Sequence, residues 1–405
     1  MSEMLKGVKI LELANWVAAP SACAMLADMG AEVIKVEHPD TGDAVRSLNV
    51  TTAGIGTNTG GLNTVFEQLN RGKQSMGINL EVVEGQEAVR RLAATVDVVV
   101  TNLTPHRQLR YGLTYEDMNA VNPRIIYVVL TGYGMEGPER DRSGFDYAAF
   151  WARSGIMATL GEQGSPPVQQ RPGFGDQTTS LAITSAIGMA LFERERSGYG
   201  QQIDCALLHT ALWANVADVV ASLKDRAAMP RNDREQAANP LFNFYETKGG
   251  KWVQLVMIQS DRFWEGFCRA LGLESLIADS RFYSHAARTE NSADLRQIIT
   301  DRFAERTLDE CASGLDEGRC IWAPIQTLDE VIDDPQVIAN EFTTTLEHPE
   351  DGEFQLVKMP MKFHRTPAEV AELAPELGQH TETVLLNLGY SWDDITRLKD
   401  RGAIV

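Results

Sequence analysis

"VKILELANWVAAPSACAMLADMGAEVIKVE", residues 8–37, predicts a strand, a helix and a second strand. Residues 8–13 and 31–37 are short apolar runs of the kind that form buried strands. Between them, Pro20 stands where a helix begins and Gly30 stands where it ends. A strand, a helix and a strand in this order are the repeating unit of an α/β fold.

The same alternation continues along the first half of the chain. Apolar runs predict further strands, and amphipathic segments between them predict helices: strands 76–80, 96–102 and 124–132, and helices 81–96 and 115–121. A long helix is predicted from 177 to about 196, and it is expected to be buried because its middle is apolar on every side. We therefore expect a mostly parallel sheet with helices on both faces.

The character of the sequence changes near residue 220. Residues 224–240 are polar and irregular, and they are followed by a strand at 250–258 and by helices at 261–272 and 290–315. This change predicts a small domain inserted into a larger one, with residues 1–219 as the first part of the large domain, 220–325 as the small domain, and 326–405 as a linker and return to the large domain. Residues 39–75 form a long excursion rich in Gly, Thr and Asn, and long ordered loops are often functional.

Composition excludes several classes of protein. The chain has 405 residues and a formal net charge of −19, which argues against nucleic acid and anionic membranes as partners. No run approaches 18 apolar residues, the N-terminus does not resemble a signal peptide, and the seven histidines form no metal-binding motif. The cysteines are scattered as in reduced cytoplasmic proteins: Cys23, Cys205, Cys268, Cys311 and Cys320.

One carboxylate stands in an unusual setting, within "RPGFGDQTTS" at residues 171–180. Asp176 follows a Gly-rich turn and precedes the long predicted helix, with no Lys or Arg between Arg171 and Arg194. It could cap the helix, or it could act as a nucleophile on an activated acyl group. The local pattern leaves both interpretations open. Asp146 is likewise interpreted as a helix cap or a turn residue. A functional role for it would require that it faces Asp176.

Two other motifs are weaker. "GYGMEG" (132–137) fits the glycine pattern of a dinucleotide site, but a loop follows it where that site needs a helix, so we interpret it as a turn. "TNLTPHRQLRYGL" (101–113) follows a strand and is either a solvated helix face or a grip for phosphate. The basic side chains that could form such a grip are His38, Arg46, Arg71, Lys73, His106, Arg107 and Arg110.

Taken together, an ordered set of segments resembles the class III CoA-transferases, the CaiB/BaiF type that includes formyl-CoA and carnitine CoA-transferases and α-methylacyl-CoA racemases. These segments cover nearly the whole chain: "LKGVKILEL", "AAPSACAMLADMGAEVIKVEHPDTGDAVR", "LNRGKQSMGINL", "TGYGMEGPERDRSGFD", "PGFGDQTTS", "SGYGQQIDCALLHTAL" and "LGQHTETVLLNLGYSWDDI". The resemblance implies a Rossmann-like large domain, a smaller inserted α+β domain and an interlocked homodimer.

The resemblance also implies a mechanism. Asp176 would attack an acyl-CoA to give an anhydride and then an aspartyl-CoA thioester, with Asp146 assisting. No permanently bound cofactor and no metal are implied, only coenzyme A thioesters as substrates. CoA would contact Asn15, Trp16, Val17, His38, Lys73, Asn102, Arg110, Ser143 and Phe145.

The chain departs from its relatives in two places. Residues 239–250, "NPLFNFYETKGG", replace the glycine run that closes over the nucleophile in formyl-CoA transferases, so the lid must differ. Phe145 stands where the racemases need a His to move a proton, which disfavours a racemase.

The acyl substrates are less defined by the sequence. "GFDYAAFWARSG" and "NDREQAANP" most resemble transferases that act on (R)-2-hydroxy acids, such as phenyllactate or 2-hydroxyisocaproate. A transferase using succinyl-CoA or another dicarboxylyl-CoA, an acyl-CoA racemase or isomerase, and a silent acyl-CoA-binding protein remain the alternatives. Apolar side chains that would suit a hydrophobic acyl chain, or belong to the core, are Trp16, Phe145, Phe150, Trp151, Phe174, Phe242 and Phe244.

Overall fold

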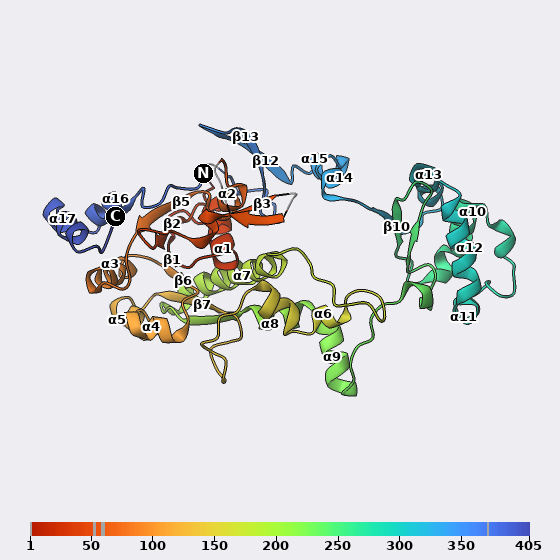
Figure 1. The fold of residues 1–405 in the computed structure, drawn as a ribbon, viewed down its shortest axis with the longest axis horizontal. Coiled ribbons are helices and arrows are strands. Elements are labelled where there is room, and N and C mark those ends of the chain that lie inside the picture. The colour runs from red at the N-terminus through yellow and green to blue at the C-terminus, as the bar shows by residue number, and fades with distance from the viewer. Residues whose placement is uncertain (1, 52–53, 58–60, 371) are drawn as a thin grey trace. The chain divides into compact units, whose positions relative to one another are not determined.

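The computed structural model describes residues 2–51, 54–57, 61–370 and 372–405 (Figure 1). Contacts divide the chain into two compact units. Unit 1 comprises Met1–Met157, Gln169–Ala227 and Glu341–Val405, and unit 2 comprises Ala158–Val168 and Ala228–Asn340. The sequence does not predict the first segment of unit 2, because eleven residues between turns carry no compositional change. The domain boundaries at 219/220 and 325/326 stay a prediction.

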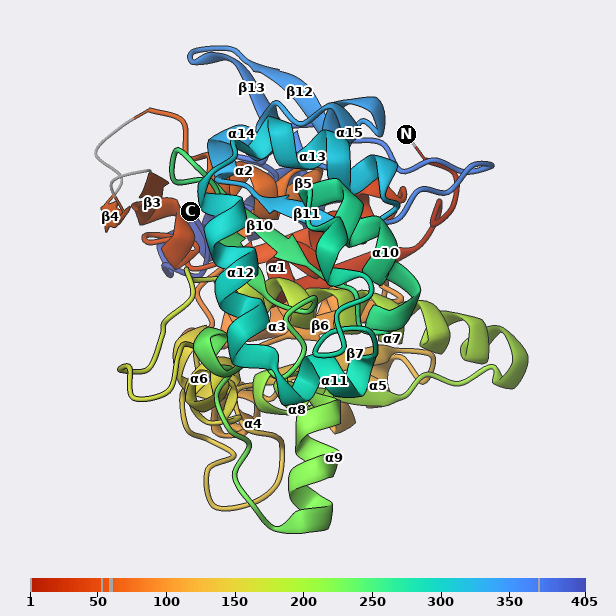
Figure 2. The same ribbon diagram turned by 90° about the vertical axis from the view of Figure 1, so that its right-hand side faces the viewer.

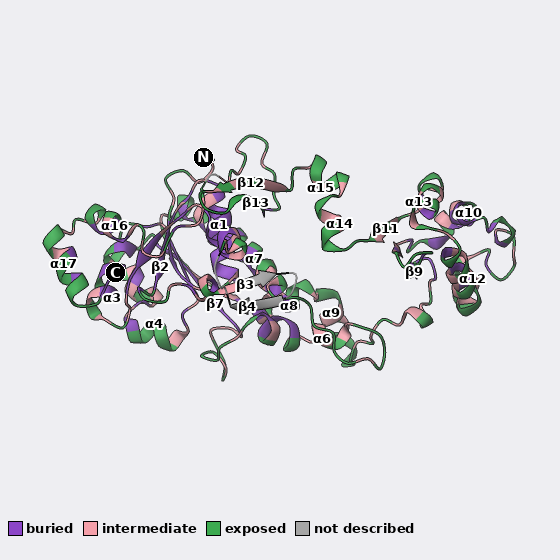
Figure 3. Ribbon diagram, turned by 45° about the horizontal axis from the view of Figure 1, so that its top comes forward, coloured by how far each residue is buried: buried purple, intermediate pink, exposed green. Residues whose placement is uncertain are grey.

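Unit 1 is built on a six-stranded parallel sheet, as the alternation of strands and helices predicts. The strands are β1 (Lys9–Leu13), β2 (Glu32–Glu37), β5 (Lys73–Gly77), β6 (Val98–Thr101), β7 (Ile126–Thr131) and β8 (Gln202–Ala206), in the spatial order β5-β2-β1-β6-β7-β8. This is the Rossmann order, which reverses between β1 and β6. The central strands are buried along their length because helices cover both faces (Figure 3).

The third strand lies earlier than expected, at 73–77 instead of 76–80. The apolar pattern of the sequence does not mark this strand correctly, because two of its buried residues, Lys73 and Ser75, are polar. Lys73 pairs with Glu12 on β1, and Ser75 donates a hydrogen bond to Glu37 on β2. In β5, Lys73 and Ser75 thus stand at buried positions that apolar side chains usually occupy. Their partners are buried carboxylates on the neighbouring strands.

Different helices cover the two faces of the sheet. One face packs against α3 (Val83–Ala93), α5 (Tyr115–Val121), α16 (Thr381–Asn387) and α17 (Trp392–Asp400), which share a core with the strands. The other face packs against α1 (Ala18–Asp28) and α7 (Phe174–Ser197), which lie along each other. The C-terminal helices therefore complete the core that the N-terminal strands begin.

Helix α7 differs from its prediction in two respects. It begins at Phe174, so Asp176 lies inside its first turn. It is also buried along one side only, since Met189 and Phe192 are 64% and 68% exposed. An apolar surface of this kind, left open in a single chain, is typical of a contact with another molecule.

Unit 2 has its own sheet and core. Its antiparallel strands are β9 (Phe244–Glu246), β10 (Trp252–Leu255) and β11 (Trp322–Ile325), in the order β11-β10-β9. The helices α10 (Ser260–Leu271), α12 (Ser292–Ala304) and α13 (Leu308–Glu317) pack onto it around a common apolar cluster (Figure 2). The single helix expected at 290–315 is broken before α13, because Thr307 caps a new helix in a capping box with Glu310.

The excursion at 39–75 is partly structured. It contains a 3-10 turn (Ala44–Ser47), the hairpin β3 (Leu48–Thr51) and β4 (Gly54–Thr57), and α2 (Thr64–Asn70). Residues 52–53 and 58–60 of this predicted loop lie outside the described residues. Among the described helices, none combines the length and apolar character needed to cross a lipid bilayer.

Candidate active site

The carboxyl ends of β1 and β6 meet where the strand order reverses. Leu13 and Thr101 are partners in the parallel ladder, and the residues that follow them also contact each other. The Asn15 N–H donates to Asn102 Oδ1 at 3.2 Å, and Asn102 Nδ2 donates back to the Asn15 carbonyl at 2.7 Å. Ligands of open α/β sheets bind in the crevice at this position.

The next two residues form a strained turn into α1. Trp16 has a φ of 74°, a left-handed conformation that bulky side chains rarely adopt. Its N–H donates to Asp43 Oδ1 at 3.0 Å. Its ring stands edge-on to the ring of Phe145, with centroids 5.1 Å apart, and both rings are exposed. Val17 is the N-cap of α1, and no side chain caps this helix.

Asp176 is the third residue of α7 and does not cap it. The N-cap is Gly173, with a φ of 90° that glycine adopts readily. The Gly173 N–H donates to Asp146 Oδ2 at 2.7 Å. A Cβ on Gly175 would lie 2.3 Å from both Asp146 Oδ1 and Phe150 Cγ, so only glycine fits there. Asp146 thus packs against the turn that carries Asp176.

The two carboxyl groups influence each other. Burial, followed by the negative charge of Asp146, raises the pKa of Asp176 to about 7. Burial also raises the pKa of Asp146, and the hydrogen bond from the Gly173 N–H opposes that rise. Within the described residues, no donor or cation pairs with the Asp176 side chain. A carboxylate without partners in an apolar setting is a stronger base and nucleophile than one in water.

The Trp16 turn and Asp176 belong to one site because α1 and α7 pack together. Val17 Cγ1 lies 4.0 Å from the position that a Cβ on Gly173 would take. One turn further on, Ser21 Oγ donates to Gln177 Oε1 at 2.7 Å. The N-termini of both helices therefore approach the same region, where their dipoles favour negative charge.

The comparisons with known proteins identify the family. The sequence model of "CoA-transferase family III" matches residues 5–381. This chain belongs to CoA-transferase family III. It is a transferase enzyme, and the resemblance seen in its motifs is confirmed.

Named relatives of this family III CoA-transferase cover its whole length. It is 32% identical to the (R)-2-hydroxy-4-methylpentanoate CoA-transferase of Clostridioides difficile, over 98% of each chain. It is 31% identical to the cinnamoyl-CoA:phenyllactate CoA-transferase of Clostridium sporogenes, over 100% of this chain and 98% of the other. It is also 33% identical to the succinyl-CoA:glutarate CoA-transferase of Mus musculus, over 99% and 90%.

A solved structure has the same fold. The crystal structure of a CAIB/BAIF family protein from Brucella suis matches with a TM-score of 0.81 at 28% identity, over 96% of this chain and 100% of that chain. The predicted α/β class with a parallel sheet is thereby confirmed.

Most of the predicted contact residues of this family III CoA-transferase lie at the carboxyl edge of the sheet. His38 follows β2 and is exposed, and Asn102 follows β6. Ser143 and Phe145 are exposed beside β7, because the backbones at Gly132 and Gly144 meet and close the intervening loop. A Cβ on Gly132 would lie 2.6 Å from Gly144 Cα. The glycines of "GYGMEG" are thus part of a loop, as expected.

Several of the basic side chains predicted to contact a ligand form ion pairs with carboxylates of the protein instead. Lys73 is buried, and its Nζ contacts Glu12 Oε2 at 2.7 Å, the Pro20 carbonyl at 2.9 Å and Asn70 Oδ1 at 3.0 Å, which leaves no donor free for a ligand. Arg110, on α4 (Pro105–Tyr111), pairs with Glu81 at the surface. Two further candidates are tied to carboxylates in the same way, Arg46 to Glu37 and Arg71 to Asp28.

The sequence interpretation missed a group of buried charges beneath the Trp16 turn. Glu12, Lys35, Glu37 and Asp43 are each 0% or 1% exposed. The presence of Glu12, Lys35 and Glu37 inside the otherwise apolar runs at 8–13 and 31–37 was the available sign, because charged residues are rarely buried unless they are paired.

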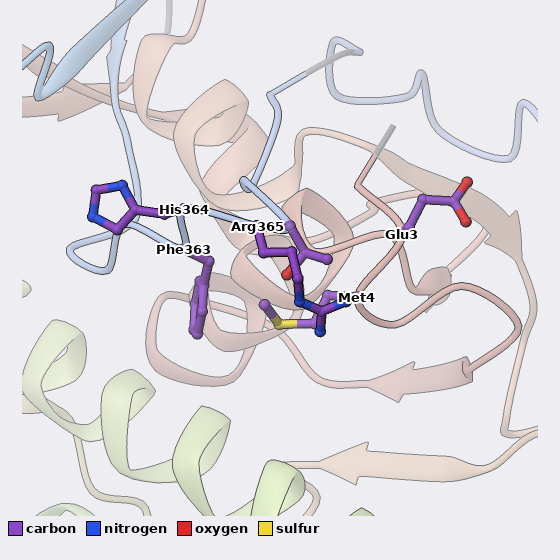
Figure 4. Close-up of a pocket in the computed structure, with 6 residues that line it drawn as sticks. Glu3, Met4, Phe363, His364 and Arg365 are labelled. Carbon is purple, nitrogen blue, oxygen red and sulfur yellow. The ribbon is translucent and has the colours of Figure 1, made fainter.

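A pocket elsewhere on unit 1 lies far from this edge. It has a volume of about 470 Å³ and is lined by Glu3, Met4, Phe363, His364, Arg365 and Thr366 (Figure 4). Met4 and Phe363 pack against Met25 and Met29, at the C-terminal end of α1. This is the opposite end of the helix from the Trp16 turn, and the pocket is therefore no part of the candidate site. Among the described residues, no cluster of His, Cys, Asp and Glu could hold a metal ion.

Proposed function

We propose that this family III CoA-transferase moves CoA from an acyl-CoA to a free carboxylic acid, with Asp176 as the nucleophile. The observation that carries the proposal is the Asp176 carboxyl group itself. It lies in the first turn of α7 with a pKa of about 7, near the edge of the sheet where the strand order reverses. Near neutral pH a large fraction of the Asp176 carboxyl groups is ionised, and no counter-ion among the described residues weakens the reactivity of this charge.

The proposed reaction proceeds in four exchanges. Asp176 attacks the thioester carbonyl, the C–S bond breaks, and CoA thiolate leaves behind a mixed anhydride. The thiolate attacks the aspartyl carbonyl and releases the donor acid as a carboxylate. The acceptor carboxylate then attacks the aspartyl thioester and expels the thiolate again. In the last step the thiolate attacks the acceptor carbonyl, giving the new acyl-CoA and free Asp176.

The surroundings of Asp176 support these steps. The tetrahedral intermediates carry negative charge, and the N-termini of α1 and α7 would stabilise it. Asp146 accepts a hydrogen bond from the Gly173 N–H, and this bond fixes the first turn of α7. We assign Asp146 to positioning Asp176 and to raising its pKa, with no bond to substrate required.

CoA is proposed to lie along the carboxyl edge of the sheet. The contact residues proposed there are Asn15, Trp16, Val17, His38, Asn102, Arg110, Ser143 and Phe145. Arg110 would have to exchange Glu81 for a phosphate, which is feasible because both side chains are about half exposed. Lys73 is proposed to support this edge from beneath and not to touch CoA.

The acceptor is proposed to be a 2-hydroxy acid or a similar medium-sized carboxylate. Relatives in Clostridioides difficile and Clostridium sporogenes are named for such acids. The exposed rings of Trp16, Phe145 and Phe174 provide an apolar surface around the nucleophile. A dicarboxylate acceptor is the alternative, since relatives named for succinyl-CoA and glutarate are equally similar.

A panel of acyl donors and acceptors separates these substrate classes. Cinnamoyl-CoA with phenyllactate, and the same donor with (R)-2-hydroxy-4-methylpentanoate, should give kcat/KM values at least about tenfold above succinyl-CoA with glutarate, because an apolar rim rejects a second carboxylate. The reverse ranking would establish the dicarboxylate class.

The nucleophile is tested by chemical trapping. Incubation with cinnamoyl-CoA followed by hydroxylamine should convert one side chain to a hydroxamate, and peptide mapping should place it at Asp176. Asp176→Ala should lose transfer by at least about 10³-fold, as loss of a covalent nucleophile does, and should bind CoA nearly as well as the wild type. Wild-type turnover in Asp176→Ala would rule out this assignment.

The active protein is proposed to be a homodimer in the cytoplasm. Exposed apolar side chains run along α7, α8 (Leu207–Ala214) and α9 (Val216–Asp225) and would be covered by a second copy. They are Leu181, Met189, Phe192, Leu212, Trp213, Val216, Val220 and Leu223. The interlocked arrangement rests on the family resemblance. The five cysteines are free thiols, which suits a reducing compartment.

A further inference from the structure

A buried ionic network lies directly beneath the Trp16 turn. Lys35 Nζ donates to Glu12 Oε1 at 2.7 Å and contacts Asp43 Oδ2 at 2.8 Å, and all three side chains have no exposed surface. Lys73 shares Glu12 from the other side, at 2.7 Å. Glu37 completes the network by accepting the Asp43 N–H at 2.8 Å and pairing with Arg46. Three carboxylates therefore balance three cations.

This network holds the backbone on both sides of Asn15. Lys35 Nζ donates to the Ala14 carbonyl at 2.8 Å, before the turn. Asp43 Oδ1 accepts the Trp16 N–H at 3.0 Å, after it. The same Asp43 oxygen accepts the Val45 N–H at 3.0 Å, which fixes the carboxylate relative to its own loop.

Trp16 is the residue that most needs such support. Its φ of 74° is unfavourable for any side chain with a Cβ, and a residue persists there only when its surroundings determine its conformation. In this conformation the Trp16 ring is exposed and contacts the ring of Phe145, next to the first turn of α7. Without the hydrogen bond to Asp43, the backbone of Trp16 would relax and its ring would move away from Phe145.

We propose that Asp43, fixed by Lys35, is a positioning residue that holds Trp16 in its strained conformation beside the nucleophile. The inference rests on the proposed function, because it concerns the same site. Asp43 touches no substrate and acts through the Trp16 backbone. Burial is the largest single effect and lowers the pKa of Lys35, but the carboxylates of Asp43, Glu12 and Glu37 together outweigh it and raise that pKa.

The strain is tested by a matched pair, Trp16→Gly and Trp16→Ala. Both variants lack the ring, and only the alanine variant places a Cβ at a positive φ; the larger backbone entropy that glycine loses on folding acts against the glycine variant. The glycine variant should melt about 2 °C or more above the alanine variant. A glycine variant that melts no higher than the alanine variant would mean that the strain does not exceed the entropic cost of glycine, and would overturn the proposal.

The role of Asp43 is tested by a double-mutant cycle. Asp43→Asn should lower kcat/KM with cinnamoyl-CoA and phenyllactate by about tenfold or more in the Trp16 background. In the Trp16→Gly background the same change should lower it by less than about threefold, because glycine adopts the conformation unaided. An equal loss in both backgrounds would show a purely structural role and overturn the proposal.

A spectroscopic measurement adds a readout independent of turnover. The fluorescence of Trp16, taken as the difference from a Trp16→Phe variant, should become at least about twofold more sensitive to acrylamide quenching in Asp43→Asn. Unchanged quenching would contradict the proposal. If Asp43→Asn does not fold, the melting temperatures of the glycine and alanine variants decide alone.

Failure of the inference is distinguishable from failure of the proposed function. If no CoA transfer occurs at Asp176, trapping with hydroxylamine gives no labelled peptide even in the wild-type chain, whereas the melting and quenching results are unaffected. If trapping succeeds and the cycle is additive, only the role of Asp43 is wrong.

Discussion

At the scale of single residues, Gly175 next to Asp176 cannot be replaced by a larger residue without displacing its neighbours. Gly175 lets the Asp146 carboxylate and the Phe150 ring approach the first turn of α7, and a Cβ would lie 2.3 Å from an atom of each. Gly188, in the same helix, has open space around it. The two glycines therefore serve different purposes, although they share a helix.

Substitution of these glycines should have opposite effects. Gly175→Ala must displace buried neighbours and is expected to destabilise the fold by ~1–3 kcal/mol and to lower kcat, because overpacking shifts the backbone that carries Asp176. Gly188→Ala is the matched control and should be neutral or stabilising by up to ~1 kcal/mol. Urea unfolding and steady-state kinetics measure both. A harmless Gly175→Ala would refute the packing argument.

At the scale of elements, ionisation of Asp176 in the first turn of α7 is expected to lower the stability of the folded protein. The pKa of Asp176 is raised to about 7, whereas an unfolded Asp ionises near pH 4. As pH rises through that interval the unfolded chain loses its proton first, so ionisation of Asp176 disfavours the native state. This cost is absent in acid and fully present above pH 7.

Removal of the charge should reveal this cost. Asp176→Asn should match the wild type near pH 4 within about 1 kcal/mol and exceed its free energy of unfolding by ~2–4 kcal/mol at pH 8. In the wild type, kcat/KM should rise between pH 6 and 8 as the carboxylate forms. Asp146→Asn should move that rise to lower pH, because it removes a neighbouring negative charge. A stability difference that is independent of pH would contradict the raised pKa.

At the scale of the whole molecule, α7, α8 and α9 carry apolar side chains that are exposed in the single chain. Phe192 and Trp213 are 68% and 74% exposed in the single chain. Exposed side chains of this size in one region mark an interface, and a second copy of the chain is the proposed occupant.

Charge introduced into this surface should disrupt assembly. The double substitution of Phe192 and Trp213 by Asp is expected to weaken the dimer at least about 100-fold, since each buried acid without a partner is costly. Light scattering after size exclusion, over a range of concentrations, measures the change. Val83→Asp is the control, because Val83 is equally exposed but begins α3, where an acid is tolerated. A mutant that remains a dimer would place the interface elsewhere.

The sequence by itself determined the elements whose residues follow a local period. The apolar runs at 8–13, 31–37 and 124–132 form buried strands close to their predicted limits. The order of motifs determined the family, because it extends along the whole chain. Both kinds of information lie in the order of residues along the chain, and neither requires knowledge of a contact between distant residues.

Only the tertiary structure decided which side chains are free to act. Lys73 and Asp176 are both charged residues in the sequence, yet β1 supplies Glu12 to Lys73, whereas none of the elements that the structure describes supplies a counter-ion to Asp176. The polar strand at 73–77 and the strained backbone of Trp16 were equally hidden, because their partners are Glu12, Glu37 and Asp43 on other elements. Burial and charge pairing join residues distant in sequence, and no local period encodes them.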